Sequence, residues 1–380
     1  MTEKEAYVAF NLTEQVGSVK VGEFEAKFGS VVAAWENYPK KVSRAGGEVD
    51  WQNEFRLAKK FGVEILTPAD DDYPQQLKDA PGRPLALYVK GDVKALSKPA
   101  LALIGTRRAT PYGLDQAFGF ARDLAAGGWM ILSGLALGID AESHKGALAA
   151  GGVTVGVIGS GLDRFYPEEN RELAREIVAK GGAVVSEFPF GRAPDTQTFP
   201  QRNHVVAALA RGVIAIESPL KSGTLITTGI AADLGRTVMA VPGRVDSRSS
   251  QGCLKLIREG ARLVRNARDV EEEMSELLPR TKLSAPKGGR TTQGARKVRP
   301  DASVAPEPAS SESVVPPAPP YSVEEALVMR HVDVEGISID ELVRKTKLPV
   351  AKVNALCMTL RLKGRLRYFP GNRVALPRAN

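Results

Sequence analysis

The chain has 380 residues, 43% of them hydrophobic, and a formal net charge of +8, so it is long enough for one large α/β domain and one or two small ones. The positive charge indicates an anionic partner, without separating nucleic acid from an acidic protein or a membrane surface. The two cysteines, Cys253 and Cys357, have no metal-ligand spacing, and no apolar run approaches the roughly 18 residues of a membrane span. These features argue against a disulfide framework, a metal site and a membrane anchor, and they predict a soluble cytoplasmic protein.

Residues 1–75 are predicted to form a small helical domain. Phe24 and Phe28 repeat at i, i+4, as on one face of an amphipathic helix. Two interpretations fit the aromatic residues of this segment, including Trp35 and Trp51: core packing, which we favour, and stacking on bases.

Residues 76–280 are predicted to form one α/β domain. From about residue 100, short apolar runs alternate with amphipathic stretches, as expected for strands buried on both faces and the helices between them. Thr110 and Pro111 supply a helix cap and a proline at the first helical position. The repeated strand–helix–strand order predicts an extended Rossmann-like, doubly wound, mainly parallel sheet. The predicted strands are 100–105, 129–133, 153–158, 183–188, 212–217 and 237–241.

Residues 281–320 are basic at first and then rich in Pro, Ala and Ser, which predicts a disordered linker. Its basic half is either a solvated tether, the default interpretation, or a weak sequence-independent contact with phosphates.

Residues 321–380 are predicted to form a winged-helix domain. Three short helical patterns over 323–331, 338–346 and 350–362 precede two short strands around Pro370-Gly371-Asn372. Such modules bind DNA and dock proteins about equally often, and the basic residues Lys352, Arg361 and Lys363 do not separate these roles.

In an open parallel sheet, ligands bind beyond the carboxyl ends of the strands, so the loop after each predicted strand is a candidate site. The first such loop combines a glycine, a hydroxyl and two guanidinium groups ahead of a helix, a set that suits phosphate: Gly105, Thr106, Arg107 and Arg108. Arginines at a helix start oppose the macrodipole and need an anionic partner. That partner is a ligand phosphate or an intramolecular carboxylate.

The second and third loops suggest no catalysis. Asp140 is predicted to cap a helix, and His144 to be a hydrogen-bonded structural histidine, because no nucleophile is paired with it. After Gly159 and Gly161, a dinucleotide fingerprint requires a third glycine where this chain has Arg164. We therefore predict no nucleotide cofactor.

The fourth and fifth loops again suit an anion. The fourth offers an aromatic ring for a base and polar groups for a phosphate: Phe199, Gln201, Arg202 and Asn203. For Phe199, hydrophobic anchoring of the loop is the alternative that we favour. The fifth brings an ammonium group, two hydroxyls and backbone amides to a helix start: Lys221, Ser222, Gly223 and Thr224. It lacks the spaced first glycine of a Walker A loop, so ATP hydrolysis does not follow.

Together these segments resemble the DprA (Smf) family of DNA-processing proteins over about 200 residues. The resemblance is carried by a series of ordered motifs: Asp72-Tyr73-Pro74, Ile104-Gly105-Thr106-Arg107, Ser133-Gly134-Leu135-Ala136, Gly138-Ile139-Asp140, Gly159-Ser160-Gly161-Leu162-Asp163, Tyr166-Pro167, Ser186-Glu187, Phe199-Pro200-Gln201-Arg202-Asn203, Ser222-Gly223-Thr224-Leu225-Ile226-Thr227 and Val241-Pro242-Gly243. The flanking helical domain, of the SAM-like type, and the winged helix also occur in that family.

The resemblance implies a homodimer that binds single-stranded DNA in a basic pocket, protects it and loads RecA recombinase onto it in natural transformation or DNA repair. It places Arg107, Arg202-Asn203 and Ser222-Gly223 in that pocket. Two positions depart from the family pattern: Glu168 stands where lysine is frequent, and His204 where arginine is frequent. The resemblance therefore implies weaker binding or compensation by Lys145, Arg164 or Lys221.

Two other functions compete with this one. A Rossmann-like nucleotide-processing hydrolase requires a catalytic glutamate after its phosphate loop, where this chain has Leu225-Ile226-Thr227-Thr228. A winged-helix transcription regulator requires tight, sequence-specific duplex binding. We expect a binding protein and not an enzyme, because the sequence shows neither a base near a nucleophile nor a cluster of metal ligands.

Overall fold

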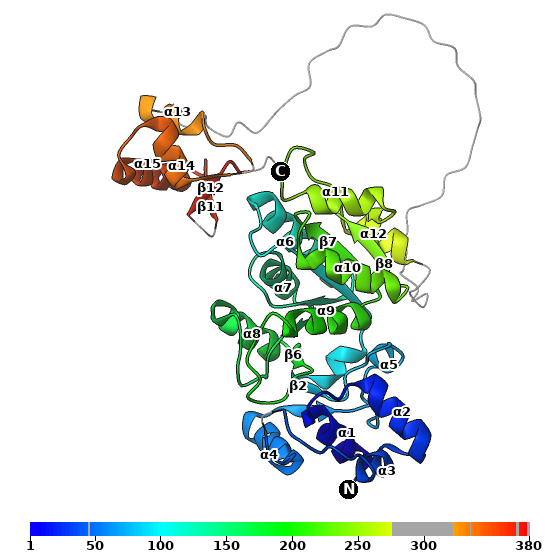
Figure 1. Ribbon diagram of the computed structural model, residues 1–380. Helices are drawn as coiled ribbons and strands as arrows, with labels where there is room; N and C mark the ends of the chain where they lie inside the picture. The colour runs from blue at the N-terminus through cyan, green and yellow to red at the C-terminus, as the bar shows by residue number, and fades with distance from the viewer. Residues whose placement is uncertain (45, 276–321, 335, 370–371, 378–380) are drawn as a thin grey trace, which may run out of the picture. The chain divides into compact units, whose positions relative to one another are not determined.

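The computed structural model describes residues 1–44, 46–275, 322–334, 336–369 and 372–377. The chain divides into two compact units, one built on Met1–Ser275 and the other formed by C-terminal residues (Figure 1). The linker predicted over 281–320 lies outside the described residues.

The N-terminal part is helical, with α1 (Glu3–Leu12), α2 (Ser18–Phe28), α3 (Val31–Glu36) and α4 (Trp51–Phe61). Its aromatic residues pack inward, as favoured from the sequence. The ring of Phe10 meets that of Trp35 edge to face at 5.1 Å, and Trp51 packs on Phe55 at 6.3 Å. Core packing therefore accounts for these tryptophans without a ligand.

A nine-stranded sheet follows, in the order β1-β2-β6-β5-β4-β3-β7-β8-β9. Seven neighbouring strands of this order, β6-β5-β4-β3-β7-β8-β9, are parallel to one another, whereas β2 runs antiparallel to β6 and to β1. The bounds are β1 (Glu64–Leu66), β2 (Leu87–Gly91), β3 (Ala100–Gly105), β4 (Met130–Ser133), β5 (Thr154–Val157), β6 (Ala183–Ser186), β7 (Gly212–Glu217), β8 (Thr237–Ala240) and β9 (Arg262–Leu263).

The six predicted strands all occur, with ends that differ by at most two residues, and the sheet is Rossmann-like and mainly parallel. The strands β1, β2 and β9 were not predicted. β1 lies inside the range assigned to the helical domain, so the sheet begins before the expected boundary at residue 75. A three-residue strand carries too little periodicity to be recognised, and β1 exists because it pairs with β2.

Helices cover both faces of the sheet (Figure 1). One face packs against α6 (Pro111–Ala126), α7 (Ile139–Ala149), α8 (Arg171–Ala179) and α12 (Ala267–Met274). The other packs against α5 (Gln75–Lys78), α9 (Thr198–Leu209), α10 (Gly223–Asp233) and α11 (Gln251–Arg258). Short 3₁₀ turns, η1 (Val93–Ser97) and η2 (Glu168–Asn170), complete this unit.

The start of α6 illustrates why the local sequence folds as it does. The hydroxyl of Thr110 accepts a hydrogen bond from the amide of Gly113 at 3.2 Å, and Pro111 occupies the first helical position, where no amide is needed. The helix ends at Ala126, and Gly127 is its C-terminal cap residue.

The C-terminal unit is a winged helix. It contains α13 (Val323–Met329), β10 (Ile337–Ser338), α14 (Ile339–Thr346), α15 (Val350–Leu362), β11 (Arg367–Phe369) and β12 (Arg373–Ala375), and its three strands are antiparallel in the order β10-β12-β11. Leu342, Val353, Cys357 and Leu360 are buried in its core. Cys357 is thus a core residue, and burial raises the pKa of its thiol to about 11.

Candidate functional site

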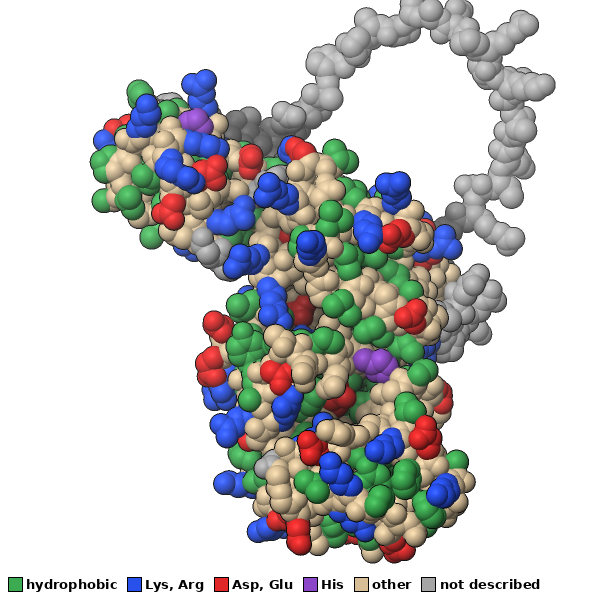
Figure 2. Space-filling model, in the orientation of Figure 1, with side chains coloured by type: hydrophobic (Ala, Val, Ile, Leu, Met, Phe, Trp, Pro, Cys, Tyr) green, Lys and Arg blue, Asp and Glu red, His purple; other side chains and the backbone are tan. Residues whose placement is uncertain are grey.

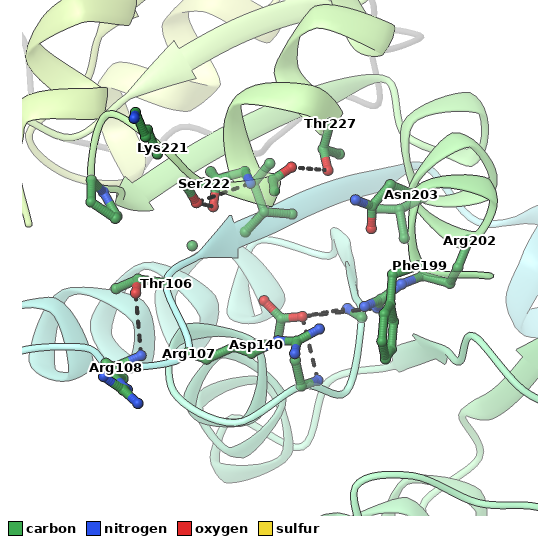
Figure 3. Close-up of a pocket in the computed structure, with 18 residues that line it drawn as sticks. Thr106, Arg107, Arg108, Asp140, Phe199, Arg202, Asn203, Lys221, Ser222 and Thr227 are labelled. Atoms are coloured by element: carbon green, nitrogen blue, oxygen red, sulfur yellow. Dashed lines mark hydrogen bonds and ion pairs between the residues drawn. The ribbon is translucent and has the colours of Figure 1, made fainter. Parts of the chain in front are cut away.

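A cavity of about 340 Å³ lies where the loops after β3, β4 and β7 meet the first turns of α9 (Figure 3). The chain runs from β3 through β4 and β5 to β6, then returns to place β7 on the other side of β3. Open α/β sheets bind ligands beyond such a reversal of strand order. The predicted site residues that line the cavity are Gly105, Thr106, Arg107, Arg108, Phe199, Arg202, Asn203, Lys221, Ser222, Gly223 and Thr224.

The loop after β3 is held by its backbone. The amide of Thr106 donates to the carbonyl of Glu217 at 2.8 Å, and the carbonyl of Thr106 accepts from the amide of Ile139 at 3.3 Å. The hydroxyl of Thr106 also accepts from the amide of Arg108 at 3.2 Å. The loop is therefore fixed against β7 and α7, which sets the direction of its side chains.

Arg107 and Arg108 are both exposed, and within the described part of the chain neither forms an ion pair. The guanidinium of Arg107 lies over the ring of Phe199, 4.7 Å from its centroid. Figure 3 shows the side chain of Arg108 extending away from the other labelled residues. The structure thus offers no intramolecular carboxylate partner for Arg107 within those residues, and the stack presents its charge at the cavity.

Glu217, at the end of β7, is a structural part of this site that the sequence did not reveal. Its buried carboxylate accepts hydrogen bonds from the amide of Thr110 at 2.8 Å and from the hydroxyl of Thr110 at 2.7 Å. It thereby ties the start of α6 to β7. The sequence does carry one signal for its role, since a charged residue ends the otherwise apolar run of β7.

The loop after β7 leads into α10. The hydroxyl of Ser222 caps this helix by accepting from the amide of Thr224 at 3.1 Å, and it donates to the hydroxyl of Thr224 at 2.9 Å. The hydroxyl of Thr227, which also lines the cavity, donates to the carbonyl of Gly223 at 3.2 Å. A helix start beside the exposed Lys221 gives this side of the cavity a positive potential.

Arg202 occupies a different position from the one expected of a phosphate ligand. It is only 6% exposed, its Nη1 donates to the carbonyl of Val157 at 3.0 Å, and the same atom is 4.0 Å from Oδ2 of Asp140. Burial lowers the pKa of Arg202, and Asp140 opposes that shift. Arg202 therefore forms part of the cavity wall with a partly neutralised charge.

The prediction that Asp140 caps a helix was wrong. Gly138 occupies the cap position of α7, and Asp140 is the second helical residue. Its carboxylate accepts from the amides of Gly134 at 3.1 Å and Ala136 at 3.4 Å, and burial raises its pKa against the opposing effect of Arg202. Asp140 thus joins the loop after β4 to α9, a contact between segments about 60 residues apart that local sequence does not encode.

Three predicted site residues do not line the cavity. Lys145 is exposed and pairs with Glu142 at 3.1 Å, Arg164 lies 3.8 Å from Asp163, and Gln201 is exposed on α9. The compensating roles considered for Lys145 and Arg164 therefore have no support in their positions.

A smaller hollow adjoins the cavity and shares Arg107, Phe199 and Arg202 with it. Its other side includes Leu137 and Tyr166, both partly exposed, and the ring of Tyr166 lies 6.2 Å from that of Phe199. The sequence had marked Tyr166 only as part of a motif. This aromatic surface extends the basic cavity.

The two departures from the family pattern lie outside both hollows. Arg171 donates to both carboxylate oxygens of Glu168, at 2.5 and 2.6 Å, and lowers the pKa of that carboxyl. His204 is partly buried, its Nε2 lies 3.8 Å from the position that a Cβ on Gly82 would take, and burial lowers its pKa. Glu168 is thus neutralised by Arg171.

His144, the histidine considered in the sequence, has a structural role. His144 is buried, its Nδ1 is 2.7 Å from the hydroxyl of Thr154, and burial lowers its pKa to about 3. Within the residues that the structure describes, no three His, Cys, Asp or Glu side chains are grouped as metal ligands. None of the described helices is long and apolar enough to cross a membrane.

Comparison with known proteins agrees with this fold. The profile of the family "DNA recombination-mediator protein A" matches residues 64–275, and the "DprA winged helix domain" matches residues 307–372. Protein Smf of Escherichia coli is 34% identical over 83% of this chain and 78% of its own length. The chain belongs to the DprA/Smf family. The names of this family and its members describe DNA processing and the mediation of recombination.

Two solved structures of the family are similar to this chain. The DNA processing protein A of Streptococcus pneumoniae has 32% identity and a TM-score of 0.59, covering 72% of this chain and 98% of its own. That of Helicobacter pylori, described for its single-stranded DNA binding mode, has 31% identity and a TM-score of 0.51, covering 56% of this chain and 96% of its own. Both likenesses support the Rossmann-like assignment for this DprA/Smf member.

Proposed function

We propose that the cavity beyond β3 and β7 binds the sugar–phosphate backbone of single-stranded DNA, and that the protein, as a homodimer in the cytoplasm, delivers the strand to RecA recombinase without catalysing a reaction. The observation that carries this proposal is the exposed Arg107, whose guanidinium lies over the ring of Phe199 and which lines the same cavity as the start of α10. The single-stranded DNA binding mode described for the H. pylori relative also supports the proposal. The RecA and homodimer parts rest on family resemblance.

The chemistry of the cavity favours a nucleic-acid strand over a small metabolite. Arg107, Lys221 and the amides at the start of α10 are phosphate ligands. The rings of Phe199 and Tyr166 offer stacking surfaces that tolerate any base. No described residue of the cavity provides a base paired with a nucleophile, and the carboxylate of Glu217 is engaged by Thr110.

The first expected result is a preference for single strands with little sequence dependence, because phosphate ligands and stacking surfaces do not read base edges. Gel shifts with a labelled oligonucleotide, alone and annealed to its complement, measure it. Equal or tighter binding of the duplex would contradict the proposal. The RecA step is checked by whether the protein shortens the lag before RecA-dependent ATP hydrolysis on single strands.

A chain ending at Ser275 is expected to retain single-strand binding. The cavity and its supporting contacts all lie within the unit built on Met1–Ser275. Fluorescence anisotropy with a labelled oligonucleotide would compare this truncation with the full chain. Loss of binding in a truncated protein with an unchanged circular dichroism spectrum would make the winged helix the main DNA reader.

Glu168→Lys is expected to tighten single-strand binding. Position 168 follows Tyr166 and Pro167, which line the smaller hollow, and the change replaces a carboxylate by an ammonium group and releases Arg171. The logarithmic salt slope should steepen by about 0.7 for each new phosphate contact. The control is Glu172→Lys, which breaks the equivalent pair with Arg175 one turn further along. Equal effects of the two variants would indicate net charge alone.

A further inference from the structure

The winged-helix unit exposes an apolar stripe along α15. Ala351, Ala355, Met358 and Leu362 follow one another at i, i+4, i+7 and i+11, the spacing of a heptad seam, and all four are exposed. Met358 is 52% and Leu362 83% exposed. The opposite side of the helix carries Val353, Cys357 and Leu360 into the core. The stripe therefore lies on a different face of α15 from the one that packs into the domain core. A contiguous exposed apolar surface of this kind marks an interaction site.

The charged side chains that α15 itself carries beside the stripe are both positive. Between Val350 and Leu362 the only ionisable side chains besides the buried thiol are Lys352 and Arg361, one on each side of the stripe, and Lys363 follows. Arg361 lies over the ring of Tyr368, 5.3 Å from its centroid, and forms no ion pair among the described residues. Figure 2 shows hydrophobic, basic and acidic side chains interspersed on the visible surface of this unit.

Duplex DNA fits this surface poorly, although α15 corresponds to the recognition helix of a DNA-reading module. Base edges in the major groove are read by Arg, Lys, Asn and Gln, whereas the centre of the exposed face here is alanine, methionine and leucine. The two flanking lysines are also engaged within the domain: Lys352 pairs with Glu324, and Lys363 with the buried Glu325 at 2.7 Å. Their charges are partly neutralised before any phosphate arrives.

A second copy of α15 also fits poorly. Packing two such stripes against each other would bring Arg361, which forms no ion pair among the described residues, near the cations of the other copy, and α15 itself carries no carboxylate to receive it. A partner that carries carboxylates beside its own apolar seam would match both the stripe and its flanks. We infer that α15 docks an acidic amphipathic helix of a partner protein, with Met358 and Leu362 as its apolar anchors and Arg361 as its charged contact.

The test uses the full chain and two synthetic peptides of about 20 residues, long enough to form a helix. Both have leucine at heptad positions a and d, and they carry either glutamate or lysine at the flanking positions. Fluorescence anisotropy should show binding of the glutamate peptide at least tenfold tighter than that of the lysine peptide. Met358→Glu with Leu362→Glu should abolish this binding, since both side chains are exposed and the helix should persist.

The matched control is Val323→Glu with Val334→Glu, which adds the same charge at two exposed apolar positions outside α15 and should leave peptide binding unchanged. Arg361→Ala should weaken binding of the glutamate peptide without restoring that of the lysine peptide. Absence of glutamate-peptide binding, equal binding of both peptides, or equal loss in the control variant would overturn the inference. It would also be overturned if the α15 variant, unlike the control, lost duplex DNA binding or dissociated a dimer in light scattering, because DNA or a second copy would then occupy the stripe.

Discussion

Arg107→Ala is expected to weaken single-strand binding by roughly 10- to 150-fold, the equivalent of about 1.5–3 kcal/mol for one charge-assisted contact. Arg107 is the exposed cation that the loop after β3 presents over Phe199, and no described carboxylate neutralises it. The salt slope should become shallower by about 0.7 if the side chain contacts one phosphate. Dissociation constants measured by anisotropy at several salt concentrations give both quantities.

Two variants separate this contact from a general effect of charge. Arg122→Ala removes one positive charge from the same unit of the chain. Because Arg122 lies near the C-terminal end of α6 and pairs with Asp123 at 2.8 Å, DNA binding should change little. Arg107→Lys keeps the charge but replaces the planar guanidinium that lies over the ring of Phe199, so we expect an intermediate affinity. If Arg107→Ala leaves the affinity unchanged, or if Arg122→Ala lowers it by the same factor, Arg107 is not a DNA contact.

Gly138→Ala is the second change expected to have a large effect, and it acts through the backbone. Gly138 has φ +79° and ψ −125°, a conformation that costs a residue with a side chain on the order of 1–3 kcal/mol. A Cβ there would lie 2.5 Å from the carbonyl oxygen of Thr106 and 2.8 Å from that of Arg107. The loop that carries Arg107 must move to relieve this contact, so affinity for single strands should fall by about tenfold or more.

Gly151→Ala is the control for Gly138→Ala, because Gly151 follows the other end of α7, has φ +67°, and would place its Cβ in open space. Both variants should lower the midpoint of thermal unfolding, but only Gly138→Ala should weaken DNA binding. Equal affinities for the two folded variants would show that the position of the loop after β3 does not govern binding.

The sequence by itself determined six strands of the sheet, β3 to β8, the helices between them and the loops that meet at the cavity. A strand buried on both faces must be apolar over its whole length, and a helix between such strands must start at a cap and stop at a residue such as glycine, so these elements are encoded locally. Arg107, Lys221 and Ser222 could be identified because the carboxyl ends of parallel strands gather at one edge of the sheet.

The tertiary structure alone decided which of these side chains are available to a ligand. Arg107 and Arg202 are the same residue type in equally suggestive loops, yet Arg107 is exposed on an aromatic ring and Arg202 is buried beside Asp140. The partner of Glu217 and the pairing of β1 with β2 could likewise not be read from the sequence, because each contact joins residues distant in the chain. Ion pairing and burial are set by three-dimensional contacts. The local sequence can place an arginine at the edge of a site, but it does not show which carboxylate another segment brings beside that arginine.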